Sequence, residues 1–123
     1  MLSEQQVSGV MSDIAADMTG FIAASLVDLD SGMTLGVYAK QGDFDLTAAS
    51  AFNSELVKQK QKVMAALGLD MVLEDMILTL SEQIHVIKLV SPSTFLYLAA
   101  DRENTNLAIV RNAINKHADA LAG

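Results

Sequence analysis

The sequence predicts an α+β fold in which helices cover both faces of an antiparallel sheet, in the order helix, two strands, helix, three strands, helix. The main observation is a meander of three short runs rich in Ile, Val, Leu and aromatic residues, over residues 71–80, 84–90 and 95–100. Runs of this kind, separated by polar turns, are typical of antiparallel strands. The third run is apolar on both sides, so it needs helices above and below it.

Length and composition narrow the class of protein. The chain has 123 residues, half of them hydrophobic, which predicts a single domain over residues 1–123. Its net charge of -7 argues against nucleic acid and anionic lipid as partners, because both attract basic surfaces. The absence of cysteine excludes disulfides and suits a cytoplasmic protein. No signal-peptide pattern and no apolar run of about 18 residues is present, so we expect no membrane insertion.

The first helix is predicted over residues 3–18. Ser3 and Gln6 fit a capping box, in which each side chain accepts a hydrogen bond from the backbone of the other residue. Gly20 is a suitable stop. The apolar positions at helical spacing are Val7, Val10, Met11, Ile14 and Met18. These features predict a helix that packs on a sheet.

Two strands are predicted next, over residues 21–29 and 33–38, joined in a hairpin by a tight turn at residues 30–32. Asp28 and Asp30 beside a glycine could indicate calcium. However, the twelve-residue acidic loop and its closing Glu are missing, so the pattern favours a turn.

The second helix has an unusually wide apolar arc. Asp45 or Thr47 can cap it, and it runs to about Leu67 before Gly68. One apolar stripe consists of Ala49, Phe52, Leu56, Val63 and Leu67, a second of Asn53, Val57, Lys60 and Met64, and the polar arc of Ser54, Glu55, Lys58, Gln61 and Lys62. The two stripes span roughly 180°, more than the ≈100° that one sheet requires. Either a deep groove or the helix's own long side chains cover the excess, or another protein chain does.

The last helix is predicted from about residue 105 to residue 121, after several candidate caps in residues 101–106. Its apolar face consists of Leu107, Val110, Ala113, Ile114, Ala118 and Leu121. This helix and the first one can lie side by side on one face of the sheet, with the middle helix on the other.

Four segments together resemble the Roadblock/dynein light-chain domain family: residues 20–32 (GFIAASLVDLDSG), the long helix after Asp45, residues 73–78 (LEDMIL) and residues 96–107 (LYLAADRENTNL). The resemblance covers nearly the whole chain. It implies a five-stranded antiparallel sheet between one helix and a helix pair, a profilin-like layout. It also implies a homodimer, or a heterodimer with another Roadblock-type chain.

In that family the two middle helices pack antiparallel and the strands equivalent to residues 71–80 form a continuous sheet across the dimer. Such a dimer would cover the wide apolar arc and occupy an open sheet edge. The interface residues that it implies are Asn53, Val57, Lys60, Met64, Leu73, Asp75 and Ile77. Glu74 and Asp75 oppose this, because acidic residues on an edge discourage pairing. Lys60 could offset one of them; otherwise the helices alone form the dimer, or the partner is a different Roadblock chain with a basic strand.

The polar residues do not form a recognisable active site, so we expect no catalytic residue, metal or cofactor. Only His85 and His117 could act as a base at neutral pH. His85 lies in a predicted strand, and His117 lies near a helix C-terminus, where a protonated imidazole is favourable. Structural roles are favoured for both. Two isolated histidines give no zinc site, and no glycine-rich phosphate loop is present.

The resemblance makes a non-enzymatic dimeric regulator or scaffold of a small Ras-like GTPase the leading hypothesis, since bacterial and archaeal members of the family commonly act in this way. The expected docking surface is the exposed arc of the paired middle helices, at Ser54, Lys58, Gln61 and Lys62. An arginine finger is not expected, because Arg102 and Arg111 both lie near the start of the last helix. The alternative is a structural light-chain-type adaptor that clamps a larger polypeptide.

Overall fold

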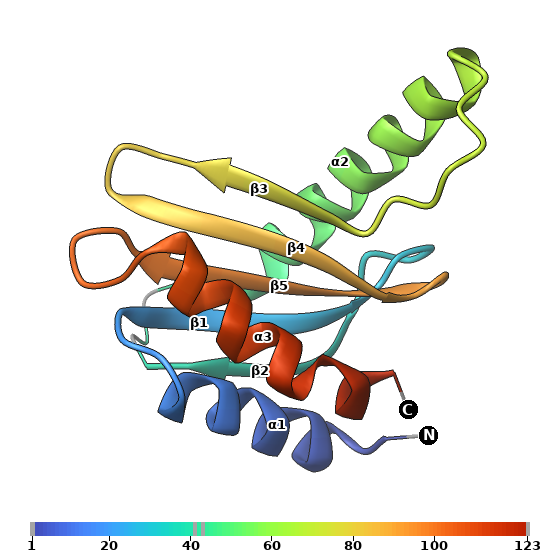
Figure 1. Cartoon of the computed structure of the whole chain (residues 1–123). Coiled ribbons are helices and arrows are strands. Elements are labelled where there is room, and N and C mark those ends of the chain that lie inside the picture. The colour runs from blue at the N-terminus through green and yellow to red at the C-terminus, as the bar shows by residue number, and fades with distance from the viewer. Residues whose placement is uncertain (1, 41, 43, 123) are drawn as a thin grey trace.

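The computed structural model describes residues 2–40, 42 and 44–122 (Figure 1). The helices and strands are α1 Glu4–Ala16, β1 Phe21–Asp28, β2 Thr34–Ala39, α2 Leu46–Ala66, β3 Asp75–Thr79, β4 Gln83–Ser91, β5 Thr94–Asp101 and α3 Leu107–Leu121. In this part of the chain the strands form one five-stranded sheet in the order β2-β1-β5-β4-β3, and every neighbouring pair is antiparallel. The predicted fold class and element order are confirmed.

The sheet separates two apolar layers. α1 and α3 lie side by side over one face, and α2 crosses the other (Figure 1). The central strands β1 and β5 contribute side chains to both layers, so residues 21–27 and 95–100 are all buried. This explains why the run over residues 95–100 is apolar on both sides.

Local capping chemistry fixes where the helices begin. The Ser3 hydroxyl accepts from the Gln6 backbone N–H at 3.1 Å, and the Gln6 side chain accepts from the Ser3 N–H at 2.8 Å, which confirms the predicted capping box. Asp45, rather than Thr47, caps α2 by accepting from the Ala48 N–H at 3.0 Å. None of these described helices is both long enough and apolar enough to cross a membrane.

The two edges of the sheet differ in cover. At the β2 edge α1 packs closely, because a Cβ on Gly36 would lie only 2.5 Å from a methyl carbon of Val7. Ser8 of α1 also donates a hydrogen bond to the Val37 carbonyl at 2.7 Å. At the β3 edge, Figure 1 shows no described element beyond the strand. β3 is therefore an edge strand whose outward backbone groups no described element covers.

The prediction of a strand from residue 71 is wrong, since β3 begins at Asp75. The first ladder contact is the Leu89 N–H donating to the Glu74 carbonyl at 3.0 Å. Before it, residues 67–74 return the chain from the far end of α2, which extends beyond the sheet (Figure 1). The apolar residues at 71–73 therefore span a gap instead of pairing with β4.

Candidate protein-interaction site

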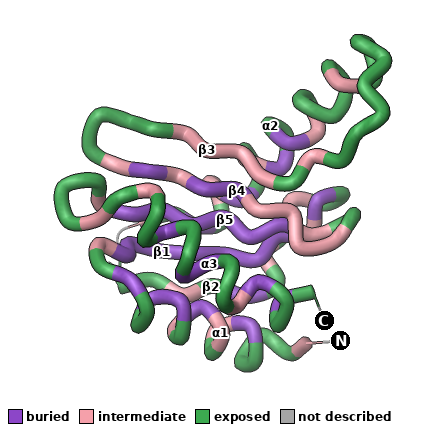
Figure 2. The backbone as a smooth tube through the Cα atoms, viewed as in Figure 1, coloured by how far each residue is buried: buried purple, intermediate pink, exposed green. Residues whose placement is uncertain are grey.

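α2 extends past the sheet that supports it. Its N-terminal half lies over the strands, and its C-terminal half continues beyond the β3 edge (Figure 1). We call residues 59–74, the second half of α2 and the segment that returns to β3, the arm. Every arm residue except Met64 and Leu73 is exposed (Figure 2). The exposed residues include Leu67, Met71 and Val72, with 67%, 65% and 85% of their surface accessible.

A row of apolar side chains follows one side of α2 into the arm. We call this row the apolar stripe; its members are Phe52, Leu56, Val63 and Leu67, all exposed. Their spacings of four, seven and four residues place them on one side of a helix. An exposed row of apolar side chains of this kind is typical of protein-interaction sites.

The side of α2 that faces the sheet carries small hydroxyl residues. Ser50 and Ser54 are both buried. The Ser50 and Ser25 hydroxyl oxygens lie 2.8 Å apart, and the Ser54 hydroxyl donates to the Leu29 carbonyl at 2.6 Å. Because these hydroxyls have partners, two polar residues can occupy the core side without leaving a buried group unpaired.

The side of α2 that faces the sheet therefore differs from the expected one. Val57, expected at an interface, is fully buried in the core of this chain. Asn53 is half-buried, and its amide donates to the Ala49 carbonyl at 2.8 Å. The predicted exposure of Ser54 is wrong, because the residue faces the sheet.

The remaining predicted site residues lie on α2, the arm or β3. Lys58 is half-buried, and its ammonium group donates to the Asp30 carbonyl at 2.9 Å and lies 3.5 Å from a Glu55 carboxylate oxygen. Gln61 and Lys62 are exposed. Lys60 is also exposed, and the positions that are half-buried are Met64, Leu73, Asp75 and Ile77.

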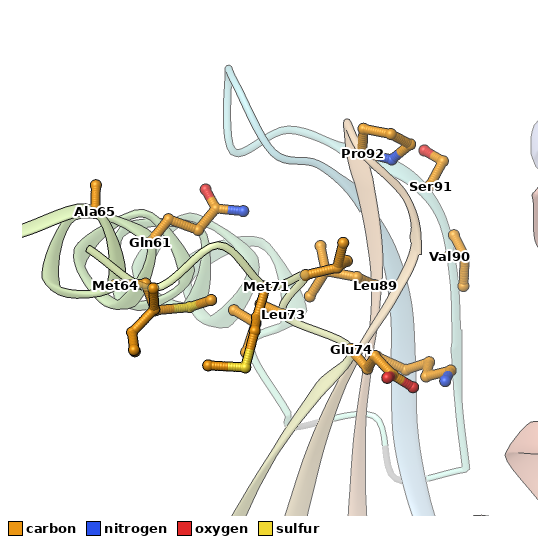
Figure 3. A pocket seen from close by; sticks show the side chains of 13 residues that line it. Gln61, Met64, Ala65, Met71, Leu73, Glu74, Leu89, Val90, Ser91 and Pro92 are labelled. Atoms are coloured by element: carbon orange, nitrogen blue, oxygen red, sulfur yellow. The ribbon is translucent and has the colours of Figure 1, made fainter. Parts of the chain in front are cut away.

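Two adjoining clefts lie against the arm. One, of about 630 Å³, separates α2 from the β4–β5 turn: Figure 3 shows Met64 on one side, Pro92 on the other, and Met71 between them. The second, of about 610 Å³, extends to the β3 edge, where Lys60 and Arg111 line it. Residues of the returning segment line both clefts, so this segment has open space on two sides.

The acidic start of β3 has a partner on α3. The Arg111 guanidinium lies 3.6 Å from a carboxylate oxygen of Asp75. The sequence pattern pointed to Lys60 for this role and gave no sign of Arg111, since only the crossing of α3 over the sheet brings Arg111 and Asp75 together. An exposed ion pair contributes little to stability. It does, however, offset an acidic charge at the open edge.

Both histidines have polar partners. His85 lies between the Gln83 side-chain oxygen, 2.7 Å from Nε2, and the Tyr97 hydroxyl, 3.2 Å from Nδ1. Burial lowers the pKa of His85, and burial raises the pKa of Tyr97 to about 12, so both groups are neutral at pH 7. On the other face His117 Nε2 lies 2.6 Å from Asp17. The described residues contain no group of three or more His, Cys, Asp or Glu that could hold a metal.

No protein-family model matches the sequence, and no curated protein matches it. Solved structures do match. MglB of Myxococcus xanthus, 17% identical, superposes with a TM-score of 0.78 over 97% of this chain and 90% of that one. A Roadblock/LC7 domain from Streptomyces avermitilis, also 17% identical, gives 0.81 over 93% and 92%.

The chain has the Roadblock/LC7 fold. The gliding protein MglB of Thermus thermophilus also matches it, with a TM-score of 0.82 over 97% of this chain and 87% of that one, at 16% identity. At such identities the likeness lies in the backbone arrangement rather than in shared side chains. The role of each arm residue in this Roadblock/LC7 fold is therefore argued from its own exposure and contacts.

Proposed function

We propose that this protein is a non-enzymatic, cytoplasmic, dimeric regulator or scaffold that binds a small Ras-like GTPase. Two findings support this function. The fold is shared with MglB structures, and the family resemblance of the sequence implies regulation of such GTPases. The observation that carries the proposal is the uncovered arm, whose apolar stripe lies beside an open β3 edge.

The free energies involved indicate that a dimer would have to cover both the apolar stripe and the β3 edge. At about 2 kcal/mol per fully exposed side chain, covering the stripes of two protomers contributes roughly 9 kcal/mol. Association itself costs about 4–15 kcal/mol. Covering the stripe alone therefore gives little net free energy of association. Backbone pairing at the β3 edges would make the association more favourable. A dimer that covers both features at once also removes the exposed edge.

A regulator of this kind need not supply a catalytic group. It can bind one conformation of the switch loops of the GTPase and so shift an existing equilibrium. Gln61 and Lys62 are the exposed members of the predicted docking surface, and Lys58 lies beside them. Lys62 suits an acidic patch on the partner.

The test is binding to purified Ras-like GTPases from the same source, loaded with GDP or with a GTP analogue. We expect a complex that prefers one nucleotide state, and weaker binding for Lys62→Glu. Lys40→Glu reverses the charge of an exposed lysine just after β2, at the opposite edge of the sheet, and serves as the matched control. Failure to bind any of these GTPases in either state would rule out the proposed function.

The light-chain-type adaptor is favoured by one observation, the cleft of about 630 Å³ beside the arm, which has room for a peptide. Capture of a non-GTPase polypeptide, or equal binding of the GDP and GTP forms, would support the adaptor function.

A further inference from the structure

Four polar side chains form a hydrogen-bonded row on the face of the sheet that α2 crosses. Gln83 Oε1 lies 2.7 Å from His85 Nε2, and the Tyr97 hydroxyl oxygen lies 3.2 Å from His85 Nδ1. The Asn53 side chain, from α2, hydrogen-bonds to the same hydroxyl. We call these four residues the polar row. We infer that the polar row is an acid-sensitive link, which ties α2 to β4 and β5 while His85 is neutral and opens when His85 binds a proton.

The polar row is satisfied in one arrangement of hydrogens. Gln83 Oε1 can only accept, so His85 carries its hydrogen on Nε2 and leaves Nδ1 as an acceptor. The Tyr97 hydroxyl therefore donates to Nδ1, and its oxygen accepts from the Asn53 amide. The other amide hydrogen of Asn53 goes to the Ala49 carbonyl, with a donor–acceptor distance of 2.8 Å. The continuity of the row from β4 to α2 thus depends on a neutral imidazole.

The polar row joins α2 to the part of the sheet on which it is least firmly packed. α2 packs most closely on β1 and β2, where the Ser50 and Ser54 hydroxyls also hold it. Toward β4 and β3 the apolar residues beneath it, Met76 and Leu78, are only partly buried. Because apolar packing is weaker there, the hydrogen bond from Asn53 is needed to keep this side of the helix on the sheet.

A proton on His85 Nδ1 interrupts the row at its middle. Nδ1 then becomes a donor, so the Tyr97 hydroxyl must accept from it and the hydroxyl hydrogen loses its acceptor. Tyr97 has only 1% of its surface accessible, so water does not replace that acceptor while α2 stays in place. An unpaired buried hydroxyl and a charge on a half-buried ring both cost free energy. Movement of Asn53 and its helix away from the sheet lets water reach both groups and removes this cost.

Burial, rather than a neighbouring charge, lowers the pKa of His85 below 6.5. On the adjacent strands, the Asp75 carboxylate contacts Arg111 of α3, on the other face of the sheet, and the Asp101 carboxylate accepts from the Asn104 amide. In the described part of the chain, no hydrogen bond or ion pair reaches His85 from the other charged residues of the surrounding segments, which are Glu55, Lys58, Lys60, Lys62, Glu82 and Lys88. The link is therefore closed at pH 7 and opens on the acid side of pH 6.5.

Amide hydrogen exchange of the full chain, followed by NMR between about pH 7.5 and pH 5, tests the link. After correction for the intrinsic pH dependence of exchange, the protection of the amides over residues 50–58 should fall by about fivefold or more at acid pH. The midpoint of this fall should coincide with the titration of the His85 ring. The amides of α1 and α3, which cover the other face, should keep their protection over the same range.

His85→Gln is the decisive variant, because its amide can donate to Gln83 and accept from Tyr97 but does not titrate. It should keep α2 as protected at pH 5 as at pH 7.5. His117→Gln, which removes the histidine on the other face, is the matched control and should retain the pH dependence. Tyr97→Phe interrupts the row at every pH, so it should lower the protection of residues 50–58 already at pH 7.5, and it tests the link without His85→Gln.

Three results would overturn the inference. The first is a pH-dependent loss of α2 protection that persists in His85→Gln, and the second is an α2 that stays protected while His85 titrates. The third is a folded Tyr97→Phe variant with unchanged α2 protection at pH 7.5. None of these measurements involves a GTPase, so the outcome is independent of the proposed function.

Discussion

The Ser54 hydroxyl holds α2 to the end of β1 through its 2.6 Å hydrogen bond to the Leu29 carbonyl. Replacing it in Ser54→Ala leaves that carbonyl without this donor inside the protein. We expect the free energy of unfolding to fall by about 1–2 kcal/mol, as measured by urea denaturation. Ser81→Ala, in the exposed turn before β4, is the control and should change stability by less than about 0.5 kcal/mol. Equal effects of the two substitutions would contradict the assigned role of Ser54.

Asp17 links α1 to α3. Its carboxylate contacts His117 at 2.6 Å and the Lys116 ammonium at 3.1 Å, and hydrogen bonds from these two groups lower the pKa of Asp17 below 3.8. A lowered pKa in the folded state means that the charged carboxylate stabilises the fold above its ordinary pKa. This contribution is lost as the pH falls through the lowered value.

We therefore expect Asp17→Asn to be less stable than the unmodified protein at about pH 6, with the difference shrinking between about pH 5 and pH 2. Denaturation at a series of pH values measures this. Asp13→Asn removes an exposed carboxylate one turn earlier on α1 and should show a smaller difference. A pH-independent difference for Asp17→Asn would contradict the ion-pair explanation.

At the scale of elements, local chemistry made the fold predictable. The capping box at Ser3, the cap at Asp45 and the apolar run over residues 95–100 each specify an element without reference to the rest of the chain. The side of α2 that faces the sheet was not predictable in this way. Ser50 and Ser54 count as polar in any periodicity, and only their distant partners allow them into the core.

The predicted start of β3 at residue 71 was wrong for a related reason. Residues 71–73 have the composition of a strand, but α2 ends so far beyond the sheet that these residues must bridge the distance back. The length of α2 relative to the sheet is a property of the assembled fold. The same overhang creates the arm, so the part of the candidate site that the sequence misplaced is the part formed by tertiary geometry.

Pairing at the open edge of β3 can be tested by a substitution in the strand itself. Thr79 is exposed and its N–H points away from β4, so Thr79→Pro removes an edge donor without breaking the ladder inside the protomer. We expect the dimer dissociation constant, measured by analytical ultracentrifugation, to rise at least about tenfold. Leu78→Pro removes an N–H that points toward β4 and should unfold the protomer instead. Unchanged dimerisation of Thr79→Pro would exclude edge pairing.

The two faces of the sheet differ in how completely helices cover them, and we call the less covered face, on the side of α2, the unfinished face. On the side of α1 and α3, two helices cover the sheet and enclose the larger core. On the other side a single helix crosses diagonally and leaves Met76, Leu78 and Leu89 only partly buried. The exposed apolar residues of the arm lie next to this gap (Figure 2). The same contact can therefore complete the second core and cover the arm.

If a second copy completes this face, folding and association are coupled, and thermal stability must depend on protein concentration. We expect the Tm of the unmodified protein to rise with concentration in calorimetry. Phe52→Asp should abolish that rise, because it places a charge in the apolar stripe. Phe52 is 76% exposed in the protomer, so the substitution should change the stability of an isolated protomer by no more than about 0.5 kcal/mol. Met33→Asp, at 68% exposure, should keep the rise. Concentration-independent Tm values for all three proteins would mean that each chain folds alone and that the unfinished face remains open to solvent.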